Sequence, residues 1–354
     1  MKKLAVCMLA LGLLLTGCGS NDEQNSQTKS LSDVKIGALQ LAQHPALDKA
    51  YEGFKETLIE AGIKESQIDF QNASGDPSNC QTIAEKFVND GDDLIYAIAT
   101  DALQAAANKT NTIPVIGAAV TNFEEAGVVK SNDKPQTNVT GASDMNPVKE
   151  QMDLLKKLVP NAKKIAIFYC SDEANSIYQG QIAEKAAKEI GLETAIVTVP
   201  NDSSAIQQVT ESMIGKYDAI YIPTDNLLAT NMATVAQITN ANKIPCIVGE
   251  ENMCLNGGLA TLSLDYYTVG QNAAKQALAI LKGEAKPEDT AVSFIDAKDC
   301  KYFIIPAKKP MPPFLSPTGK YVPAESALMF PLILSYRSWL LLSLLMLYIF
   351  NKSD

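Results

Sequence analysis

The stretch Asp-Leu-Ile-Tyr-Ala-Ile-Ala-Thr-Asp at residues 93–101 decides how this chain folds, because a second copy of it follows later. Residues 218–225 read Asp-Ala-Ile-Tyr-Ile-Pro-Thr-Asp. In both copies an acidic residue precedes a short apolar run, and a Thr-Asp pair closes it. A short continuous apolar run is typical of a strand that is buried on both faces of a sheet. The chain therefore contains the same strand-forming unit twice.

Two further pairs of segments accompany these copies in the same order. Residues 34–38, Val-Lys-Ile-Gly-Ala, correspond to residues 163–167, Lys-Lys-Ile-Ala-Ile. Residues 113–117, Ile-Pro-Val-Ile-Gly, correspond to residues 244–249, Ile-Pro-Cys-Ile-Val-Gly. The spacing between partners is nearly the same for all three pairs, which indicates two similar domains.

Amphipathic stretches alternate with the apolar runs from residue 35 to residue 282, the pattern of parallel sheets covered by helices. Strands are expected at 35–41, 67–71, 93–98, 114–119, 164–169, 193–199, 219–222 and 246–249. The predicted fold class is α/β, with two doubly wound parallel-sheet domains joined by a multi-strand hinge. Such a hinge lets a cleft between the domains close on a ligand.

The chain is expected to cross between the domains more than once. Residues 135–146 leave the first domain. A strand at 259–264 and a helix at 266–282 have no counterpart in the second set, so both are assigned back to the first domain. Domain one is predicted to comprise residues 33–140 and 257–292, and domain two residues 141–256 and 293–303.

Residues 1–17 are predicted to be a signal peptide. Lys2 and Lys3 precede an apolar run at 4–15, which is too short for a permanent bilayer-spanning helix. Residues 15–18, Leu-Thr-Gly-Cys, then resemble a bacterial lipobox, where the leader is cleaved and Cys18 receives a lipid such as palmitate. Residues 18–32 are interpreted as the lipidated cysteine and a flexible polar tether. An ordinary secretory signal is the alternative.

The last residues, 304–354, differ in composition from the rest of the chain. They contain its only Arg and its only Trp, Arg337 and Trp339. We interpret this atypical tail as a shifted reading frame or a fused end. Alternatively, its apolar segment at 329–350 is a transmembrane anchor, although an Arg inside such a segment is costly.

Composition excludes several classes of function. The net charge of −10 argues against nucleic acid as a partner. His44 is the only His, which nearly excludes His-based metal sites and triads. Because no Gly-rich phosphate loop, Gly-x-Ser-x-Gly or metal-ligand spacing occurs, we expect no catalytic residue, no metal and no cofactor. Cys246 and Cys254 form either one disulfide or two free thiols.

Four segments carry a resemblance to a known family. They are Asn-Val-Thr-Gly at 138–141, Glu-Ala-Asn-Ser at 173–176, Pro-Thr-Asp-Asn at 223–226 and Gly-Leu-Ala-Thr at 258–261, the last followed by Asp265, Tyr266, Tyr267 and Gly270. From about residue 35 to residue 301 the chain resembles the lipoprotein solute-binding proteins of ABC importers. The resemblance is strongest to the branch whose known ligands are tryptophan and tyrosine.

Two departures from the family pattern stand out. Residues 120–123, Val-Thr-Asn-Phe, lie where the family usually has Asp-Pro. After Lys301, the family's next strand and final helix are expected to be missing and replaced by the atypical tail.

The resemblance implies a type I periplasmic binding protein-like fold and a role in transport. The chain is expected to capture a small molecule, an aromatic amino acid, between its domains and to deliver it to an ABC permease and its ATPase. A lipid anchor would hold it on the extracytoplasmic face of the cell membrane. A sugar- or purine-nucleoside-binding lipoprotein of the same architecture is the alternative.

Candidate ligand-binding residues follow the predicted strands, because ligands of doubly wound sheets collect at the carboxyl ends of the strands. They are Gln40, Ser74, Thr100, Thr121, Phe123, Asn175, Ser176, Thr224, Asp225 and Glu250.

Specific roles are predicted for a few of these candidates. Asp225 is expected to accept hydrogen bonds from an ammonium group and Ser176 to hold a carboxylate. Capping of the helices that follow the strands is the alternative role for both. Phe123 is the aromatic candidate for the cleft, whereas Tyr96 and Tyr221 are expected in the core.

Overall fold

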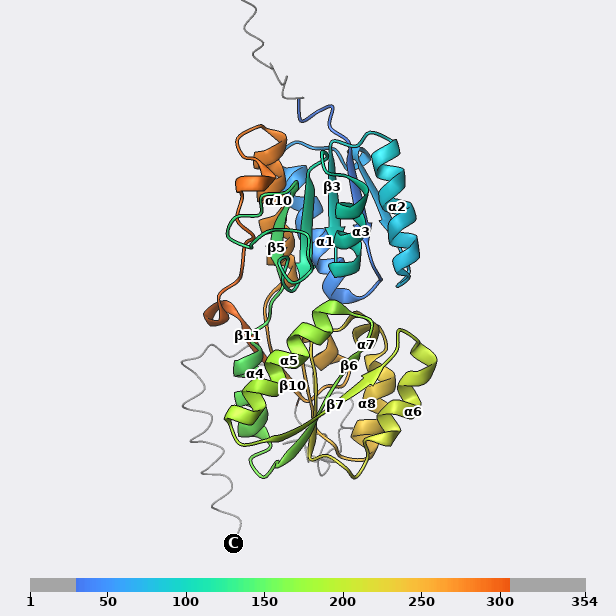
Figure 1. The fold of residues 1–354 in the computed structure, drawn as a ribbon, viewed down its shortest axis with the longest axis vertical. Helices are drawn as coiled ribbons and strands as arrows, with labels where there is room; N and C mark the ends of the chain where they lie inside the picture. Colours follow the sequence, from blue (N-terminus) through green and yellow to red (C-terminus); the bar gives the residue numbers. More distant parts are fainter. Residues whose placement is uncertain (1–29, 306–354) are drawn as a thin grey trace, which may run out of the picture.

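The computed structural model describes residues 30–305, which form two α/β domains stacked end to end (Figure 1). The chain alternates strands and helices through most of its length, as the sequence pattern predicted. The predicted signal peptide, Cys18, most of the tether and nearly all of the tail lie outside the described residues.

The first sheet has the strand order β2-β1-β3-β4-β5, and its strands are parallel. They are β1 (Ile36–Gln40), β2 (Ile68–Asn72), β3 (Leu94–Ile98), β4 (Val115–Val120) and β5 (Val139–Ser143). The helices of this domain are α1 (Pro45–Glu60), α2 (Pro77–Asn89), α3 (Thr100–Lys109) and α10 (Tyr266–Leu281). Every residue of β1, β3, β4 and β5 is buried, as expected for strands covered on both faces.

The second sheet has the order β11-β10-β9-β8-β6-β7, in which only β11 runs antiparallel to its neighbour. Its strands are β6 (Lys164–Cys170), β7 (Glu193–Val199), β8 (Ala219–Ile222), β9 (Cys246–Val248), β10 (Ala260–Ser263) and β11 (Lys301–Ile304). Its helices are α4 (Val148–Leu158), α5 (Ala174–Glu189), α6 (Ile206–Ser212), α7 (Asn226–Thr230), α8 (Met232–Ala241) and α9 (Glu251–Leu255). Two apolar clusters form the core of this domain. One includes residues of α4 and α5, and the other includes residues of α6, α8 and α9.

Two glycines fix α10 against α1 in the first domain. A Cβ atom on Gly53 would overlap the backbone carbonyl oxygen of Tyr267, and one on Gly270 would overlap that of Ala50. The two helices therefore lie closer than larger side chains would permit. In Figure 1 the orange α10 accordingly lies beside the blue α1, although the two are far apart in the sequence.

All eight strands expected between residues 35 and 249 are present, each within one residue of its predicted bounds. Tyr96 and Tyr221 are fully buried in β3 and β8, as predicted. Their hydroxyl groups donate to the Ala50 carbonyl oxygen and to Gln151 Oε1, so neither polar group is left without a partner.

Three predictions about the connections are wrong. The strand predicted at 259–264 was assigned to domain one, but β10 pairs with β9 and β11 in the second sheet. Only the helix after it, α10, packs in the first domain. Residues 139–143 were interpreted as part of an exit from domain one, yet they form β5 of the first sheet. The strand expected to be missing after Lys301 is present as β11.

The chain passes between the domains three times. It leaves the first sheet after β5 to form α4, and it returns from β10 into α10. It crosses again between Ser293, which bridges to Ala142 beside the first sheet, and β11. These crossings are the multi-strand hinge predicted from the sequence.

Two further observations concern residues 30–305 alone. Cys80, Cys170, Cys246, Cys254 and Cys300 are free, so Cys246 and Cys254 are not bonded. None of the helices in this part of the chain combines the length and apolar character that crossing a membrane requires.

Candidate functional site

The carboxyl ends of the two sheets face each other, and direct contacts join the domains there. Gln179 Nε2 on α5 donates to Thr121 Oγ1 after β4 over 3.1 Å. Asn122 Nδ2 donates to the Tyr178 hydroxyl over 3.2 Å. An ion pair of 3.1 Å joins Lys49 Nζ on α1 to Glu251 Oε2 on α9. The two domains are therefore in contact along this edge.

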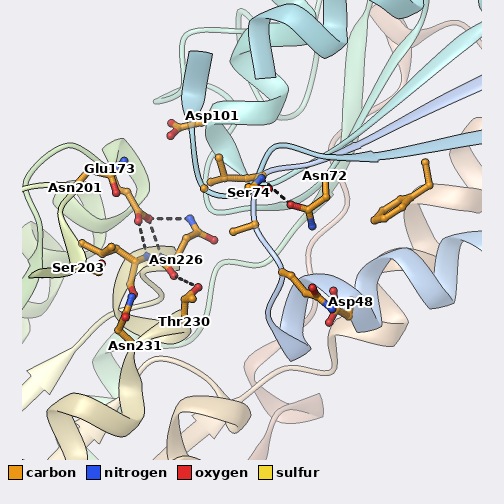
Figure 2. A pocket seen from close by; sticks show the side chains of 16 residues that line it. Asp48, Asn72, Ser74, Asp101, Glu173, Asn201, Ser203, Asn226, Thr230 and Asn231 are labelled. Atoms are coloured by element: carbon orange, nitrogen blue, oxygen red, sulfur yellow. Dashed lines mark hydrogen bonds between the residues drawn. The ribbon is translucent and has the colours of Figure 1, made fainter. Parts of the chain in front are cut away.

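A cavity of about 670 Å³ lies between the domains, and Figure 2 shows side chains from both domains around it. The first domain contributes Leu41, Ala42, Gln43, Asp48, Phe70, Asn72, Ser74, Gly75 and Asp101. The second contributes Glu173, Asn201, Ser203, Asn226, Leu227, Thr230 and Asn231. Its volume is within the range of small-molecule sites.

The charged side chains that line this cavity are all acidic. They are Asp48, Asp101 and Glu173, and no Lys or Arg joins them in the lining. Amide and hydroxyl groups supply neutral hydrogen-bond partners, and Leu41, Phe70 and Leu227 supply apolar surface. The cavity therefore suits a ligand with a cationic group, neutral polar groups and an apolar part.

Glu173 is fully engaged with its own domain. Its Oε2 accepts from the backbone N and the Nδ2 of Asn226 at 2.9 and 2.8 Å, and its Oε1 accepts from Leu227 N at 2.9 Å. Asn175 Nδ2 and Ser176 Oγ also donate to it, over 3.1 and 3.4 Å. This carboxylate stabilises the start of α7, as acidic groups at helix N-termini do.

Asp225 has the capping role that was the alternative prediction. Its Oδ1 accepts from Leu228 N at 2.8 Å, and its Oδ2 accepts from Cys170 N at 2.7 Å. Burial, together with the nearby Glu173 carboxylate, raises the pKa of Asp225. Asp225 is absent from the lining of the cavity, so the structure does not place it where the predicted ammonium contact requires.

Glu250 is a second buried cap. Its two carboxylate oxygens accept from Asn252 N and Met253 N at 2.7 Å each, at the start of α9. Burial raises the pKa of Glu250 to about 7.

Asn175, Ser176 and Thr224 belong to one buried network with Gln179. Asn175 Nδ2 and Gln179 Nε2 both donate to the Thr224 carbonyl oxygen over 3.1 Å, and Thr224 Oγ1 donates to Gln179 Oε1 over 2.9 Å. The predicted carboxylate contact of Ser176 has no support here, because Ser176 is fully buried inside this network. Thr100, Thr121 and Asn175 line a separate interdomain gap of about 10 Å³, which is too small for a solute.

Phe123, the predicted cleft aromatic, does not line the cavity. The side chain is fully buried in the first core. A Cβ atom on Gly117 would meet the Phe123 ring at 2.6 Å, so the ring lies over the glycine of β4. The loop after β4 folds back on the sheet, which its position in the sequence did not reveal.

The strand ends of the first domain differ from those of the second in their backbone. Ser74, Ala99 and Ala119 have φ angles of 58°, 86° and 54°. They lie at the carboxyl ends of β2, β3 and β4, where the ligand of such a sheet collects. Left-handed conformations of residues other than glycine are strained and occur preferentially at functional sites. Of the predicted site residues, only Ser74 lines the larger cavity.

Asp101 presents a carboxylate on this wall for which the structure records no hydrogen bond within residues 30–305. It lies in the first turn of α3 and lines the cavity (Figure 2). Burial, together with the negative charge of Glu173, raises the pKa of Asp101 to about 6. The sequence prediction had not included Asp101 among the site residues, although its position after β3 mirrors that of Asp225 after β8.

Gln40 lies behind the same wall, at the end of β1. It is fully buried, and its Nε2 donates to the Ala42 carbonyl oxygen and to Asp48 Oδ1, each over 2.8 Å. Its Oε1 has no hydrogen-bond partner among the described residues.

Several residues of the site were missed. Asp48, Asn72, Asn201 and Asn226 line the cavity, and each lies near the carboxyl end of a strand or at the start of the following helix. Their position just after a predicted strand is the feature of the sequence that could have identified them. Gln179 gave no such signal, because it lies within α5 and reaches Thr121 only when the domains are in contact. Within residues 30–305, no group of three or more His, Cys, Asp or Glu side chains is arranged to hold a metal ion.

Two facing α/β domains, a three-crossing hinge and a cavity between the strand ends define a solute-binding protein of the periplasmic type. Residues 35–308 match the model of the family described as ABC transporter substrate binding protein, and the chain belongs to this family. Proteins of the family are extracytoplasmic components of transporters, and they bind small molecules.

Three relatives give the comparison more detail. The chain is 42% identical to the tyrosine-binding protein of Clostridioides difficile strain R20291, over 77% of this chain and 81% of that protein. A Streptococcus pneumoniae ABC domain in complex with L-Trp aligns with a TM-score of 0.74 and 39% identity, covering 77% of this chain and 92% of that one. A ligand-free, open structure of a substrate binding protein from Clostridium difficile aligns with a TM-score of 0.60 and 38% identity, at the same coverage.

Proposed function

We propose that this protein captures an aromatic amino acid in the cavity between its domains and delivers it to an ABC permease. The observation that carries the proposal is the lining of the cavity, which combines acidic groups, amides, hydroxyls and an apolar part without a Lys or Arg. An α-amino acid brings an ammonium group to such a site. Asp101 is the proposed partner of that group, because its carboxylate is not engaged elsewhere within the described chain.

The comparisons support an aromatic ligand. One relative at 42% identity is named a tyrosine-binding protein, and another at 39% identity was solved with L-Trp. The chain superposes better on the L-Trp complex than on the ligand-free, open structure, although identity and coverage are nearly equal. Together with the direct contacts between the domains, this supports a closed arrangement of the kind that encloses a ligand.

A thermal-shift screen of the full chain tests this function. The screen contains the twenty amino acids, common sugars and purine nucleosides. We expect L-tyrosine or L-tryptophan to raise the melting temperature, since a ligand at a hundredfold excess over its dissociation constant stabilises the fold by about 2.7 kcal/mol. A shift with a sugar or nucleoside and none with an amino acid would instead support the alternative function. A chain truncated after residue 301 is unsuitable for this test, because it would lose β11.

We further propose that the mature protein is a lipoprotein anchored through Cys18. The lipobox at 15–18 and the polar tether after it support this. Replacing Cys18 by Ser is expected to release the protein from the membrane or to leave the precursor uncleaved. Normal membrane retention of the Cys18→Ser protein would contradict the anchor and point to the apolar segment at 329–350.

The proposed role involves binding and release without chemical change of the ligand, so we propose that the protein is not an enzyme. The residues around the cavity supply hydrogen bonds and charge. Recovery of unaltered ligand after prolonged incubation with the protein is the expected result, and mass spectrometry of the released ligand checks it.

A further inference from the structure

Gln179 is a fully buried side chain on α5, and one of its hydrogen bonds crosses from the second domain to the first. In Figure 1, α5 lies on the side of the second domain that faces the first. Gln179 Nε2 donates to Thr121 Oγ1, after β4 of the first sheet, over 3.1 Å, and both side chains are buried. The other recorded side-chain contacts between the domains within residues 30–305 each include a partly exposed side chain. They are His44–Asn226, Asn122–Tyr178 and Lys49–Glu251.

The orientation of the Gln179 amide is fixed within its own domain. Its Oε1 accepts from Thr224 N at 3.3 Å and from Thr224 Oγ1 at 2.9 Å. A backbone N–H can only donate, so the amide oxygen must face Thr224 N and the NH2 group must face Thr121. The same NH2 group donates to the carbonyl oxygens of Thr224 and Asn175. The second domain therefore presents an oriented N–H donor to the first.

The orientation of the Thr121 hydroxyl is fixed by the hinge. Thr121 Oγ1 lies 3.4 Å from Asp144 Oδ1, and a carboxylate oxygen only accepts, so the hydroxyl donates to Asp144 and keeps a lone pair for Gln179. Asp144 Oδ2 accepts from the Tyr266 hydroxyl over 2.9 Å. Asp144 follows β5, where the chain first leaves the first domain, and Tyr266 begins α10, where it returns. The Gln179–Thr121 bond therefore ends on a buried carboxylate that joins two of the three crossings.

Opening of the hinge would break one bond of this chain of hydrogen bonds and leave the others intact. Thr121, Asp144 and Tyr266 belong to the first domain and its connections, whereas Gln179 and Thr224 belong to the second domain. Each set keeps its internal hydrogen bonds when the domains separate. Neither Gln179 nor Thr121 lines the larger cavity. The bond between them therefore depends on closure of the domains and not on contact with a ligand.

We propose that Gln179 is a positioning residue of the closed arrangement, and that its hydrogen bond to Thr121, the closure contact, slows opening and thereby sets how long a ligand stays in the cavity. The inference rests on the proposed function, because a ligand must be enclosed between the domains. A hydrogen bond is stronger in a buried network than in water, and the neighbours of both groups have already oriented them. An enclosed ligand leaves only after the domains open. The closure contact therefore acts on the dissociation rate.

Two substitutions remove the closure contact from opposite sides. Gln179→Met removes the donor and Thr121→Val removes the acceptor, each with little change in side-chain volume. The full chain loaded with radiolabelled L-tyrosine is diluted into unlabelled L-tyrosine, which gives the dissociation rate. This rate should rise by about fivefold to twentyfold in each variant, the range expected for loss of a buried hydrogen bond. The association rate, calculated from the dissociation rate and the affinity, should stay within about twofold of wild type, because the ligand enters the open arrangement.

Gln151→Met is the matched control. Gln151 on α4 is also fully buried, and its amide bonds to Gly249, Leu262 and Tyr221, all within the second domain. This variant should lose stability but keep the wild-type dissociation rate.

Two further variants test the bond itself. Thr121→Ser keeps the hydroxyl and should restore a rate within about twofold of wild type. The double variant of Gln179→Met and Thr121→Val should dissociate no more than about twofold faster than the faster single variant, because both substitutions remove the same bond. If Gln179→Met fails to fold, the comparison of Thr121→Val with Thr121→Ser carries the test.

Three results would overturn the proposal. They are an unchanged dissociation rate in the folded Gln179 and Thr121 variants, an equal rise in Gln151→Met, and effects of the two substitutions that multiply in the double variant. Absence of L-tyrosine and L-tryptophan binding to the wild-type chain would instead contradict the proposed function. The closure contact does not touch the ligand, so the same change in rate is then expected for the sugar or nucleoside that the thermal-shift screen identifies.

Discussion

The two walls of the cavity use their polar groups in different ways. On the second-domain wall, Glu173 accepts hydrogen bonds from backbone N–H groups at the start of α7. Asp225 and Glu250, which are buried in the same domain, cap α7 and α9. On the first-domain wall, the Asp101 carboxylate has no recorded hydrogen bond within residues 30–305. The carboxylate of the second wall is thus satisfied within its own domain, whereas the Asp101 carboxylate of the first wall is available for a ligand.

Backbone conformation follows the same division. The strained residues Ser74, Ala99 and Ala119 all lie at the strand ends of the first domain, and no residue other than glycine at the described strand ends of the second sheet has a positive φ. Strain and unmatched polar groups persist where function requires them. An acidic residue after a strand is therefore not evidence of a ligand contact until its hydrogen bonds are counted.

The largest expected effect concerns the satisfied wall. Asp225→Ala leaves Cys170 N and Leu228 N without their acceptor, so the free energy of unfolding should fall by about 2–4 kcal/mol. Affinity for the amino acid should remain within about threefold of wild type, because Asp225 does not line the cavity. Urea denaturation and calorimetry on the same preparation measure both quantities. Asp225→Asn, which keeps one carbonyl acceptor, should lose less stability, and a large loss of affinity at normal stability would break the distinction between the walls.

The next effect is the dependence of affinity on pH. The pKa of Asp101 is raised to about 6 in the unliganded chain, and an ammonium partner favours the ionised carboxylate. Affinity should therefore be full above pH 6 and fall as the pH drops through 6, since a proton must then leave Asp101 on binding. A decrease of about tenfold from pH 7 to pH 5 is expected by calorimetry. Asp101→Asn should abolish this dependence, and its persistence in that variant would assign it to another group.

A smaller effect is expected from the ion pair that joins the two domains. Lys49 and Glu251 are partly exposed, so their contact should contribute about 0.2–1 kcal/mol to the closed arrangement. Lys49→Ala should weaken amino-acid affinity by no more than about fivefold, and added salt should reduce the difference from wild type. A hundredfold loss of amino-acid affinity in Lys49→Ala would show that the ion pair lies closer to the ligand than the structure places it.

No effect is expected from chelation. The described residues contain no group arranged to hold a metal ion, and the proposed contacts are hydrogen bonds and one ion pair with the ligand. Affinity measured after dialysis against EDTA should equal that measured before it. Loss of binding that zinc or calcium restores would refute a metal-free site.

The sequence predicted the strands well because each is a continuous apolar run. It misplaced β10, because the pattern of one strand does not say which sheet edge it joins. It did not reveal that the Phe123 ring lies over Gly117, because that contact depends on how the loop after β4 folds back on the sheet. The role of Asp225 stayed open because capping and ligand binding require the same residue at the same position. Gln40 was predicted at the site, but its unmatched oxygen depends on Asp48 and Ala42, whose contacts the sequence does not specify.

The affinity of Asp101→Asn for L-tyrosine and L-tryptophan at pH 7 tests most directly whether the first-domain wall holds the ligand. A charged hydrogen bond is worth about 1.5–3 kcal/mol, so affinity should fall by about tenfold to more than a hundredfold, while the melting temperature of the unliganded chain stays the same or rises. The same titrations on Asp225→Ala should show wild-type affinity. Unchanged affinity in Asp101→Asn, with a large loss in Asp225→Ala, would contradict the account.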